Sequence, residues 1–172
     1  MDKTLFKECG IGDANAIYEV INDAAKAYKG IIPADRYHEP YMPMEELLNE
    51  MRQIAFFGYV VTQKIVGVMG LQTMEDVTLL RHAYVLKRWQ GRGIGSNLLG
   101  HILGFINTRL VLVGTWADAH WAVNFYREHG FAVLPNKDEL LRRYWNIPDR
   151  QRETSVVLGL EINLPTTGKS IN

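Results

Sequence analysis

Residues 83–96 carry the most informative pattern in the chain and read A-Y-V-L-K-R-W-Q-G-R-G-I-G-S. The segment passes from strand-forming residues through a turn into the start of an apolar helix. Its glycines Gly91, Gly93 and Gly95 stand at alternate positions, so successive backbone N–H groups can point into one concavity. The helix that follows adds the positive end of its dipole. The pattern therefore predicts a diphosphate cradle.

The glycine spacing argues against two other phosphate-binding loops. The dinucleotide motif G-x-G-x-x-G would need a glycine where Ser96 stands, and that motif follows the first strand of a parallel βαβ unit. Gly168-Lys169-Ser170 resembles the end of a P-loop, but the first glycine of that motif would fall at Asn163. We therefore expect neither a nicotinamide site nor a P-loop.

Hydrophobic spacing on both sides of this segment predicts an alternation of strands and helices. Before it we expect a strand at 4–9, helices at 14–27 and 44–54, and an antiparallel meander of strands at 56–62, 65–72 and 77–86. After it we expect helices at 94–107, 120–129 and 137–145, and strands at 110–116, 131–134 and 154–162. This order predicts an α/β (α+β) fold with a mixed, largely antiparallel central sheet and flanking helices.

Length and charge bound the fold and its partners. The 172 residues fit one domain, expected at 1–164 with a tail at 165–172. Nineteen Lys and Arg balance nineteen Asp and Glu, so no overall positive field favours nucleic acid or an anionic membrane. Any anion must be held locally, with Arg88 and Arg92 as nearby cations. The single cysteine, Cys9, and the lack of an apolar signal or membrane-spanning run predict a cytoplasmic protein.

Two motifs in this order resemble one protein family. The loop Gln90-Gly91-Arg92-Gly93-Ile94-Gly95 matches the Q/R-x-x-G-x-G/A loop of the GNAT superfamily of acyl-CoA N-acyltransferases. Further along, residues 122–131 (A-V-N-F-Y-R-E-H-G-F) resemble the A-x-x-F-Y-x-x-x-G-F helix end of that family. Lys87 and Ala119 depart from the proline and asparagine common there. The resemblance implies a GNAT-like fold over residues 4–163 and acetyl-CoA as cosubstrate.

The resemblance also implies roles for single residues. In this family the end of the strand pairs through its backbone with the pantetheine arm, and the loop binds the pyrophosphate. The residues so implied in cofactor binding are Ala83, Tyr84, Val85, Gln90, Gly91, Arg92, Gly93, Ile94, Gly95 and Ser96. The Val85 N–H matches the donor that holds the oxyanion, and Tyr126 matches the general acid that protonates the departing thiolate. The alternative for Tyr126 is core packing with its hydroxyl at the surface.

The proton acceptor for the attacking amine stays open among Glu75, His82 and water. Both residues are expected on the strand that leads into the loop. Strand alternation would place Glu75 with Ala83 and Val85 on one face, and His82 with Tyr84 on the other. We therefore expect His82 to be out of phase with the residues that face the cofactor, in a solvated or core-capping position.

The implied reaction is transfer of an acetyl group to a primary amine by direct attack in a ternary complex. The acceptor is a small molecule or a peptide. The irregular stretch at residues 30–43 is a candidate substrate loop, and the alternative for any single residue in it is a plain connector. The basic aromatic segment 142–150 is expected to be a solvated helix face, and the alternative is a contact with an acidic substrate or the nucleotide phosphate. A non-catalytic acyl-CoA sensor or protein-interaction module on the same fold is the alternative. His120 and His129 lack partners at metal-ligand spacing, so no metal is expected. A homodimer is consistent with the resemblance.

Overall fold

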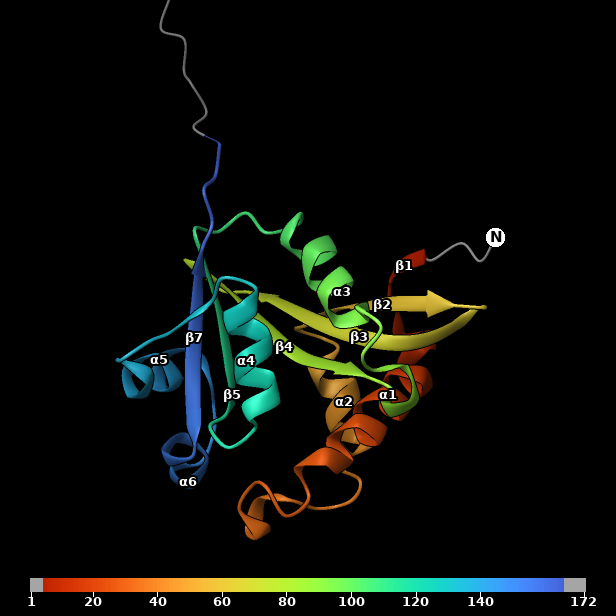
Figure 1. The fold of residues 1–172 in the computed structure, drawn as a ribbon, viewed down its shortest axis with the longest axis horizontal. Coiled ribbons are helices and arrows are strands. Elements are labelled where there is room, and N and C mark those ends of the chain that lie inside the picture. The colour runs from red at the N-terminus through yellow and green to blue at the C-terminus, as the bar shows by residue number, and fades with distance from the viewer. Residues whose placement is uncertain (1–4, 166–172) are drawn as a thin grey trace, which may run out of the picture.

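Within residues 5–165, which the computed structural model describes, the chain forms a seven-stranded sheet with helices on both faces (Figure 1). The strands are β1 (Leu5–Glu8), β2 (Ala55–Val61), β3 (Lys64–Thr73), β4 (Val77–Val85), β5 (Leu110–Trp116), β6 (Ala132–Val133) and β7 (Ser155–Glu161). The helices are α1 (Ala14–Ala25), α2 (Met44–Glu50), α3 (Ile94–Leu103), α4 (His120–Glu128), α5 (Lys137–Tyr144) and α6 (Asp149–Glu153).

The strand order β1-β2-β3-β4-β5-β7-β6 confirms the predicted mixed sheet. Strands β1 to β4 form an antiparallel meander, and β7 lies antiparallel between β5 and β6. The single parallel pair in the described sheet joins β4 to β5. It is short, because the pairing stops at Leu80 and Val113 while both strands continue. Beyond that point β4 and β5 diverge and open a gap in the middle of the sheet (Figure 1).

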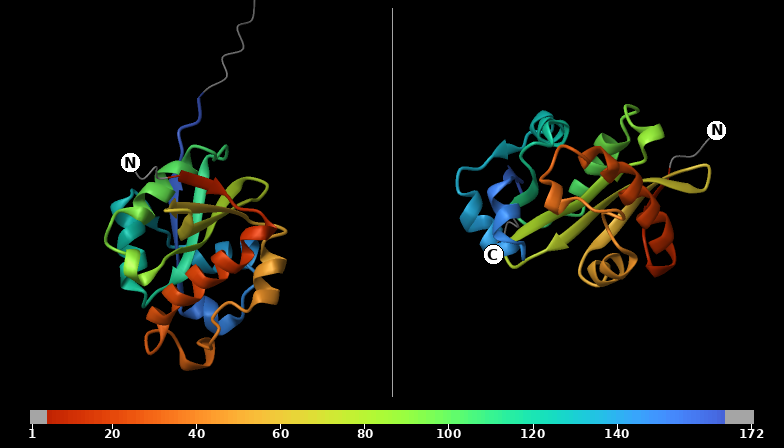
Figure 2. Two further views of the ribbon diagram at one scale, coloured as in Figure 1. Left: turned by 90° about the vertical axis from the view of Figure 1, so that its right-hand side faces the viewer. Right: turned by 90° about the horizontal axis from the view of Figure 1, so that it is seen from below.

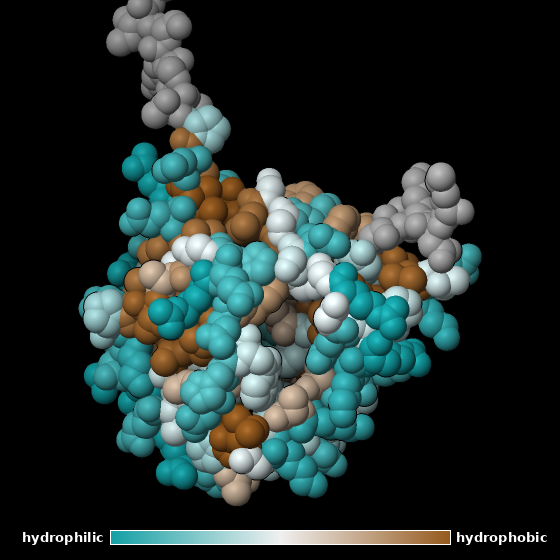
Figure 3. Space-filling model, viewed as in Figure 1, coloured by the Kyte–Doolittle hydropathy of each residue, from teal (hydrophilic) through white to brown (hydrophobic). Residues whose placement is uncertain are grey.

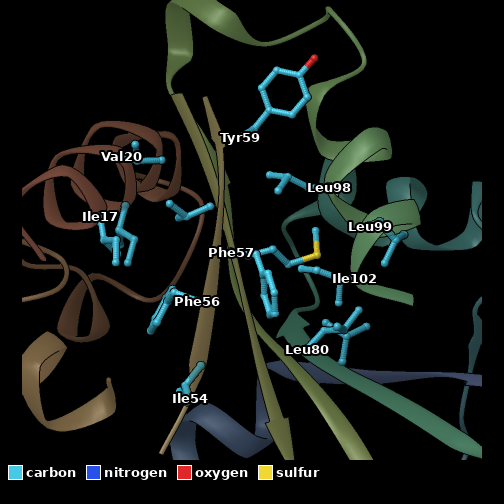
Figure 4. Packing of buried hydrophobic residues seen from close by; sticks show 14 of the residues in the cluster. Ile17, Val20, Ile54, Phe56, Phe57, Tyr59, Leu80, Leu98, Leu99 and Ile102 are labelled. Atoms are coloured by element: carbon cyan, nitrogen blue, oxygen red, sulfur yellow. The ribbon is translucent and has the colours of Figure 1, made fainter. Parts of the chain in front are cut away.

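Apolar side chains at helical spacing hold the helices on the sheet. Helix α1 buries Ile17, Val20, Ile21 and Ala24, and α3 buries Leu98, Leu99 and Ile102. Neighbouring residues of β2 point to opposite faces, so Phe56 lies on the α1 side and Phe57 on the α3 side (Figure 4). Helices α1, α2, α5 and α6 thus cover one face, while α3 and α4 cover the other (Figure 2). Each fully buried Leu or Ile contributes roughly 1.5–3 kcal/mol.

Several predicted boundaries were wrong at the element ends. The helix expected at 14–27 ends at Ala25 and tightens into a 3-10 turn over Lys26–Tyr28. The helices expected at 44–54 and 94–107 stop at Glu50 and Leu103. The strand expected at 131–134 is only a two-residue edge pair. Helix α6 was missed because five residues carry no periodic pattern, and of the expected tail 165–172 all but Pro165 falls outside the described residues.

A β-bulge in β4 breaks the alternation that we expected there. Val68 pairs with Tyr84 and Gly70 pairs with Arg81, so one residue of β3 stands opposite two residues of β4, His82 and Ala83. His82 takes a left-handed backbone conformation with φ 54°. The bulge turns its side chain to the same face as Arg81, where both contact α2. His82 thus lies on the face opposite Ala83 and Val85, as the alternation predicted, but Arg81 shares the face of His82 instead of that of Ala83, and His82 lines a cavity.

Glu75 does not lie on a strand at all. It occupies the turn between Thr73 and Val77, at the end of β4 remote from the glycine loop. At about 3.3 Å per residue, the nine residues of β4 separate it from Val85 by roughly 30 Å. Glu75 is thus excluded as a proton acceptor near the loop.

Candidate active site

The gap between β4 and β5 contains a cleft of about 320 Å³. Its walls come from α1, β3, β4, the start of α3 and α4, and a recess is visible on this face of the molecule (Figure 3). Six of the residues singled out in the sequence line it: Ala83, Tyr84, Val85, Gln90, Gly95 and Tyr126. The structure thus brings the strand end, the loop and the α4 tyrosine to one cavity.

The edge of β4 that faces this cleft offers free backbone groups. Leu86 donates its N–H to the Val66 carbonyl on β3. Because neighbouring residues of a strand direct their backbone groups to opposite sides, Val85 points its N–H and C=O away from β3. The Val85 carbonyl accepts a hydrogen bond from Gln90 Nε2 at 2.9 Å, which ties the loop to the strand. A carbonyl oxygen has a second lone pair, so this edge can still accept from an extended ligand.

The glycine loop has the backbone conformation that its sequence predicts. Gly91 and Gly93 have φ values of 75° and 79°, which L-residues with side chains rarely adopt. Gly93 is the N-cap of α3, and no side chain caps that helix, so the first-turn amides keep their hydrogen-bonding capacity. Ile94 contributes only its amide, because its side chain is buried in the core.

Two polar side chains of the loop are already engaged elsewhere. The Arg92 guanidinium lies over the Trp89 ring, 4.7 Å from its centroid. Ser96 Oγ lies 3.0 Å from His129 Nε2, and that imidazole in turn contacts the Phe125 carbonyl through Nδ1. The loop therefore offers an anion mainly backbone amides and the end of a helix.

Tyr126 reaches the cleft from α4 and is not a surface side chain. It is 4% exposed, and its ring packs edge-on against Phe125 and Phe131. Its hydroxyl makes no hydrogen bond to any other residue in the 5–165 range. Burial, followed by the nearby Tyr28, raises the pKa of the Tyr126 phenol, so it stays protonated at neutral pH. A neutral phenol in the cleft can donate one proton or one hydrogen bond.

A second cavity, of about 400 Å³, lies on the opposite face of β4. Its walls come from residues 28–50, β4, β5 and the segment from Leu141 to Ser155. Tyr28 and Tyr84 line both cavities, and their hydroxyls are 3.3 Å apart. Burial raises the pKa of both phenols. The two cavities therefore meet at this tyrosine pair, at the gap in the sheet.

Aromatic residues of the second cavity were only partly found from the sequence. The candidate loop 30–43 supplies Arg36, His38, Tyr41 and Met42 to the wall. Trp116 from β5 donates its Nε1–H to the Tyr41 hydroxyl at 3.0 Å, and it carried no local signal. Trp145 also lines the cavity and packs on Gly114, so the segment expected as a solvated helix face is partly a cavity wall.

Glu50 of α2 connects the cavity wall to the bulge. It lies 3.0 Å from His82 Nε2 and 3.4 Å from an Arg81 guanidinium nitrogen. Burial alone would raise the pKa of Glu50, but the hydrogen bond to His82 and the charges of His82 and Arg81 outweigh it and lower that pKa. Glu50 is therefore an ionised carboxylate at neutral pH. Nothing in the sequence of α2 marked it as a site residue.

Residues 5–165 contain no group of three or more His, Cys, Asp or Glu that could hold a metal ion. None of the helices in this range is long and apolar enough to span a bilayer.

Comparisons with known proteins agree with the geometry. Residues 52–133 match the family model for the acetyltransferase (GNAT) domain. The PaiA N-acetyltransferase of Thermoplasma acidophilum, solved in complex with coenzyme A, has a TM-score of 0.70 at 18% identity, covering 93% of this chain and 99% of that chain. A GNAT-family acetyltransferase from Staphylococcus aureus gives 0.72 at 19% identity, covering 94% and 100%.

The ribosomal-protein-S18-alanine N-acetyltransferase of Escherichia coli has a TM-score of 0.69 at 14% identity, covering 99% of each chain. No curated protein matches the sequence. At these identities the similarity establishes a shared fold, while the acceptor has to be argued from the cavities.

Proposed function

Because the chain carries an acetyltransferase (GNAT) domain, we propose that it transfers the acetyl group of acetyl-CoA to the primary amine of a small acceptor, by direct attack in a ternary complex. One observation carries the proposal. Two cavities on opposite faces of β4 meet at Tyr28 and Tyr84, so a cofactor and an acceptor can reach the same point from different sides.

The residues around the cleft fit a pantetheine arm and a pyrophosphate. The free edge of β4 at Ala83 and Val85 supplies backbone groups for an extended, amide-containing chain, by the logic of strand addition. The amides from Gln90 to Ser96, at the uncapped start of α3, supply donors for the diphosphate. Acetyl-CoA supplies a thioester carbonyl as the acyl donor.

Two groups serve the chemistry at the junction. The Val85 N–H points into the gap and stabilises the negative charge that develops on the carbonyl oxygen. The protonated Tyr126 phenol donates to the sulfur as the C–S bond breaks, so that a thiol rather than a thiolate leaves. The fold fixes the positions of both groups, because Val85 belongs to β4 and Tyr126 belongs to α4.

The second cavity supports a small amine as the acceptor. Its volume of about 400 Å³ suits a ligand of metabolite size. Its wall holds Glu46 and Glu50 together with Arg36 and Arg81, and Glu50 is already paired with Arg81, so Glu46 is the carboxylate that we expect to attract an ammonium group. Tyr41, Trp116 and Trp145 add aromatic side chains to the same wall. The acceptor thus enters as a cation and must lose a proton before it attacks.

Release of free thiol from acetyl-CoA tests the proposal. The rate should rise with added amine in a panel of small amines and short peptides, and the acetylated amine should appear in equal amount by mass spectrometry. Background hydrolysis without amine is the control. Binding of CoA by calorimetry with no thiol release from any acceptor would favour the acyl-CoA sensor instead.

A further inference from the structure

The bulge in β4 lies beside an imidazole in the wall of the second cavity, that of His82. His82 lines the second cavity, while the next residue, Ala83, lines the cofactor cleft. A regular strand would place Arg81 and His82 on opposite faces, so the contact of both side chains with Glu50 depends on the extra residue in β4. A left-handed backbone at a residue other than glycine costs roughly 1–3 kcal/mol and is commonest where function requires it.

The contacts of His82 define which ring nitrogen is free. Glu50 is ionised and can only accept hydrogen bonds, so the His82 nitrogen 3.0 Å from it, Nε2, must carry the proton. In the neutral ring, Nδ1 then holds a lone pair. Within residues 5–165, Nδ1 has no hydrogen-bond partner. The ring also stacks on Phe56, with centroids 5.9 Å apart, which fixes its plane.

On this basis, and resting on the proposed acetyl transfer, we propose that His82 accepts the proton of the acceptor ammonium at Nδ1 and that Glu50 is its positioning residue. An N–H bond of the ammonium breaks and an N–H bond forms at Nδ1, which leaves a neutral amine and an imidazolium next to Glu50. The imidazolium then returns the proton to water, since the His82 side chain is 15% exposed.

Other groups of the cavity are less suited to this step. Glu50 already serves both His82 and Arg81. Glu46 is exposed, and it lies on α2 rather than on the strand that borders the cofactor cleft. His38 is exposed, and its Nδ1 is engaged by the Pro40 carbonyl at 2.7 Å. His82 alone among them adjoins a residue of the cofactor cleft.

Three variants and one control separate a chemical role from a structural one. Glycine and asparagine both adopt the left-handed backbone conformation of residue 82, so His82→Gly and His82→Asn should keep the bulge. Glu50→Gln keeps the shape of the positioning residue but removes its charge. His101→Asn is the matched control, because His101 stacks on Phe6 outside both cavities.

We expect kcat to fall about 100-fold or more in both His82 variants, with KM for acetyl-CoA unchanged. Added imidazole should restore part of the rate of His82→Gly, and Glu50→Gln should lose at least about ten-fold in kcat. His101→Asn should keep the wild-type rate.

Three results would overturn the assignment. If wild type transfers acetyl groups and both His82 variants keep its rate, His82 is not the proton acceptor, although the proposed function stands. A loss that imidazole does not relieve, together with a raised KM for acetyl-CoA, would mean that His82 is structural. If wild type acetylates no amine, the proposed function falls and this assignment falls with it.

Discussion

Replacing Tyr126 with phenylalanine removes one oxygen atom from the cofactor cleft and leaves the ring in place. The ring contacts with Phe125 and Phe131 do not involve the hydroxyl, and that hydroxyl has no hydrogen-bond partner within residues 5–165. The free energy of unfolding should therefore change by less than about 0.5 kcal/mol. The loss should appear in catalysis, since Tyr126 carries the only hydroxyl group among the α4 residues that line the cleft in the described part of the chain.

A general acid typically contributes about 100-fold or more to the rate. Tyr126→Phe should thus lower kcat for thiol release by at least about 100-fold, or about 2.7 kcal/mol in activation free energy. Initial rates at saturating acetyl-CoA and amine measure this, and calorimetry should find unchanged CoA affinity. Tyr59→Phe is the matched control, because Tyr59 is also buried but borders neither cavity. A Tyr126→Phe enzyme that works within about two-fold of wild type would refute the donor role.

Three other perturbations follow from the structure. Gly93→Ala should weaken CoA binding at least about ten-fold in calorimetry. Gly30→Ala is the matched control, because Gly30 has the same φ of 79° in equally open space and the substitution carries a similar strain of about 1–2 kcal/mol, but it should keep CoA affinity. Equal CoA affinities of the two variants would contradict the cradle. Burial raises the pKa of Tyr28 and Tyr84, so on raising the pH these phenols lose their protons in the unfolded chain before they do so in the folded chain. The denaturant concentration at the unfolding midpoint should therefore fall as the pH rises above about 10, and a midpoint that does not change with pH would contradict this. Burial also raises the pKa of the Cys9 thiol to about 11, so iodoacetamide at pH 8 should react with it far more slowly than with the denatured chain, and equal rates would count against it.

Local patterns in the sequence predicted most of the fold. The strand, glycine loop and helix over 83–96 form as expected, and β5 spans the predicted 110–116. Such elements depend on residue spacing within a short segment, which is directly readable. The cofactor cleft follows from them only in part, because β4, the loop and α3 supply one side of its wall while α1, β3 and α4 supply the rest.

The acceptor cavity could not be predicted in the same way. Its wall joins residues from Tyr28 to Ser155, and no local pattern brings Trp116 beside Tyr41. One residue in the sequence, Gly70, is consistent with the bulge. A Cβ on Gly70 would come within 2.8 Å of the Arg81 carbonyl, so that glycine permits the close approach of β3 and β4 where the register shifts. An isolated glycine in a strand pattern marks such irregularities.

A crystal structure with CoA and a non-reactive amine analogue tests the central claim most directly. We predict the pantetheine arm along the free edge of β4 at Ala83 and Val85, the pyrophosphate against the amides of 90–96, and the amine nitrogen between the thiol and His82. CoA bound outside the gap between β4 and β5, or an analogue on the same face of β4 as CoA, would contradict the account.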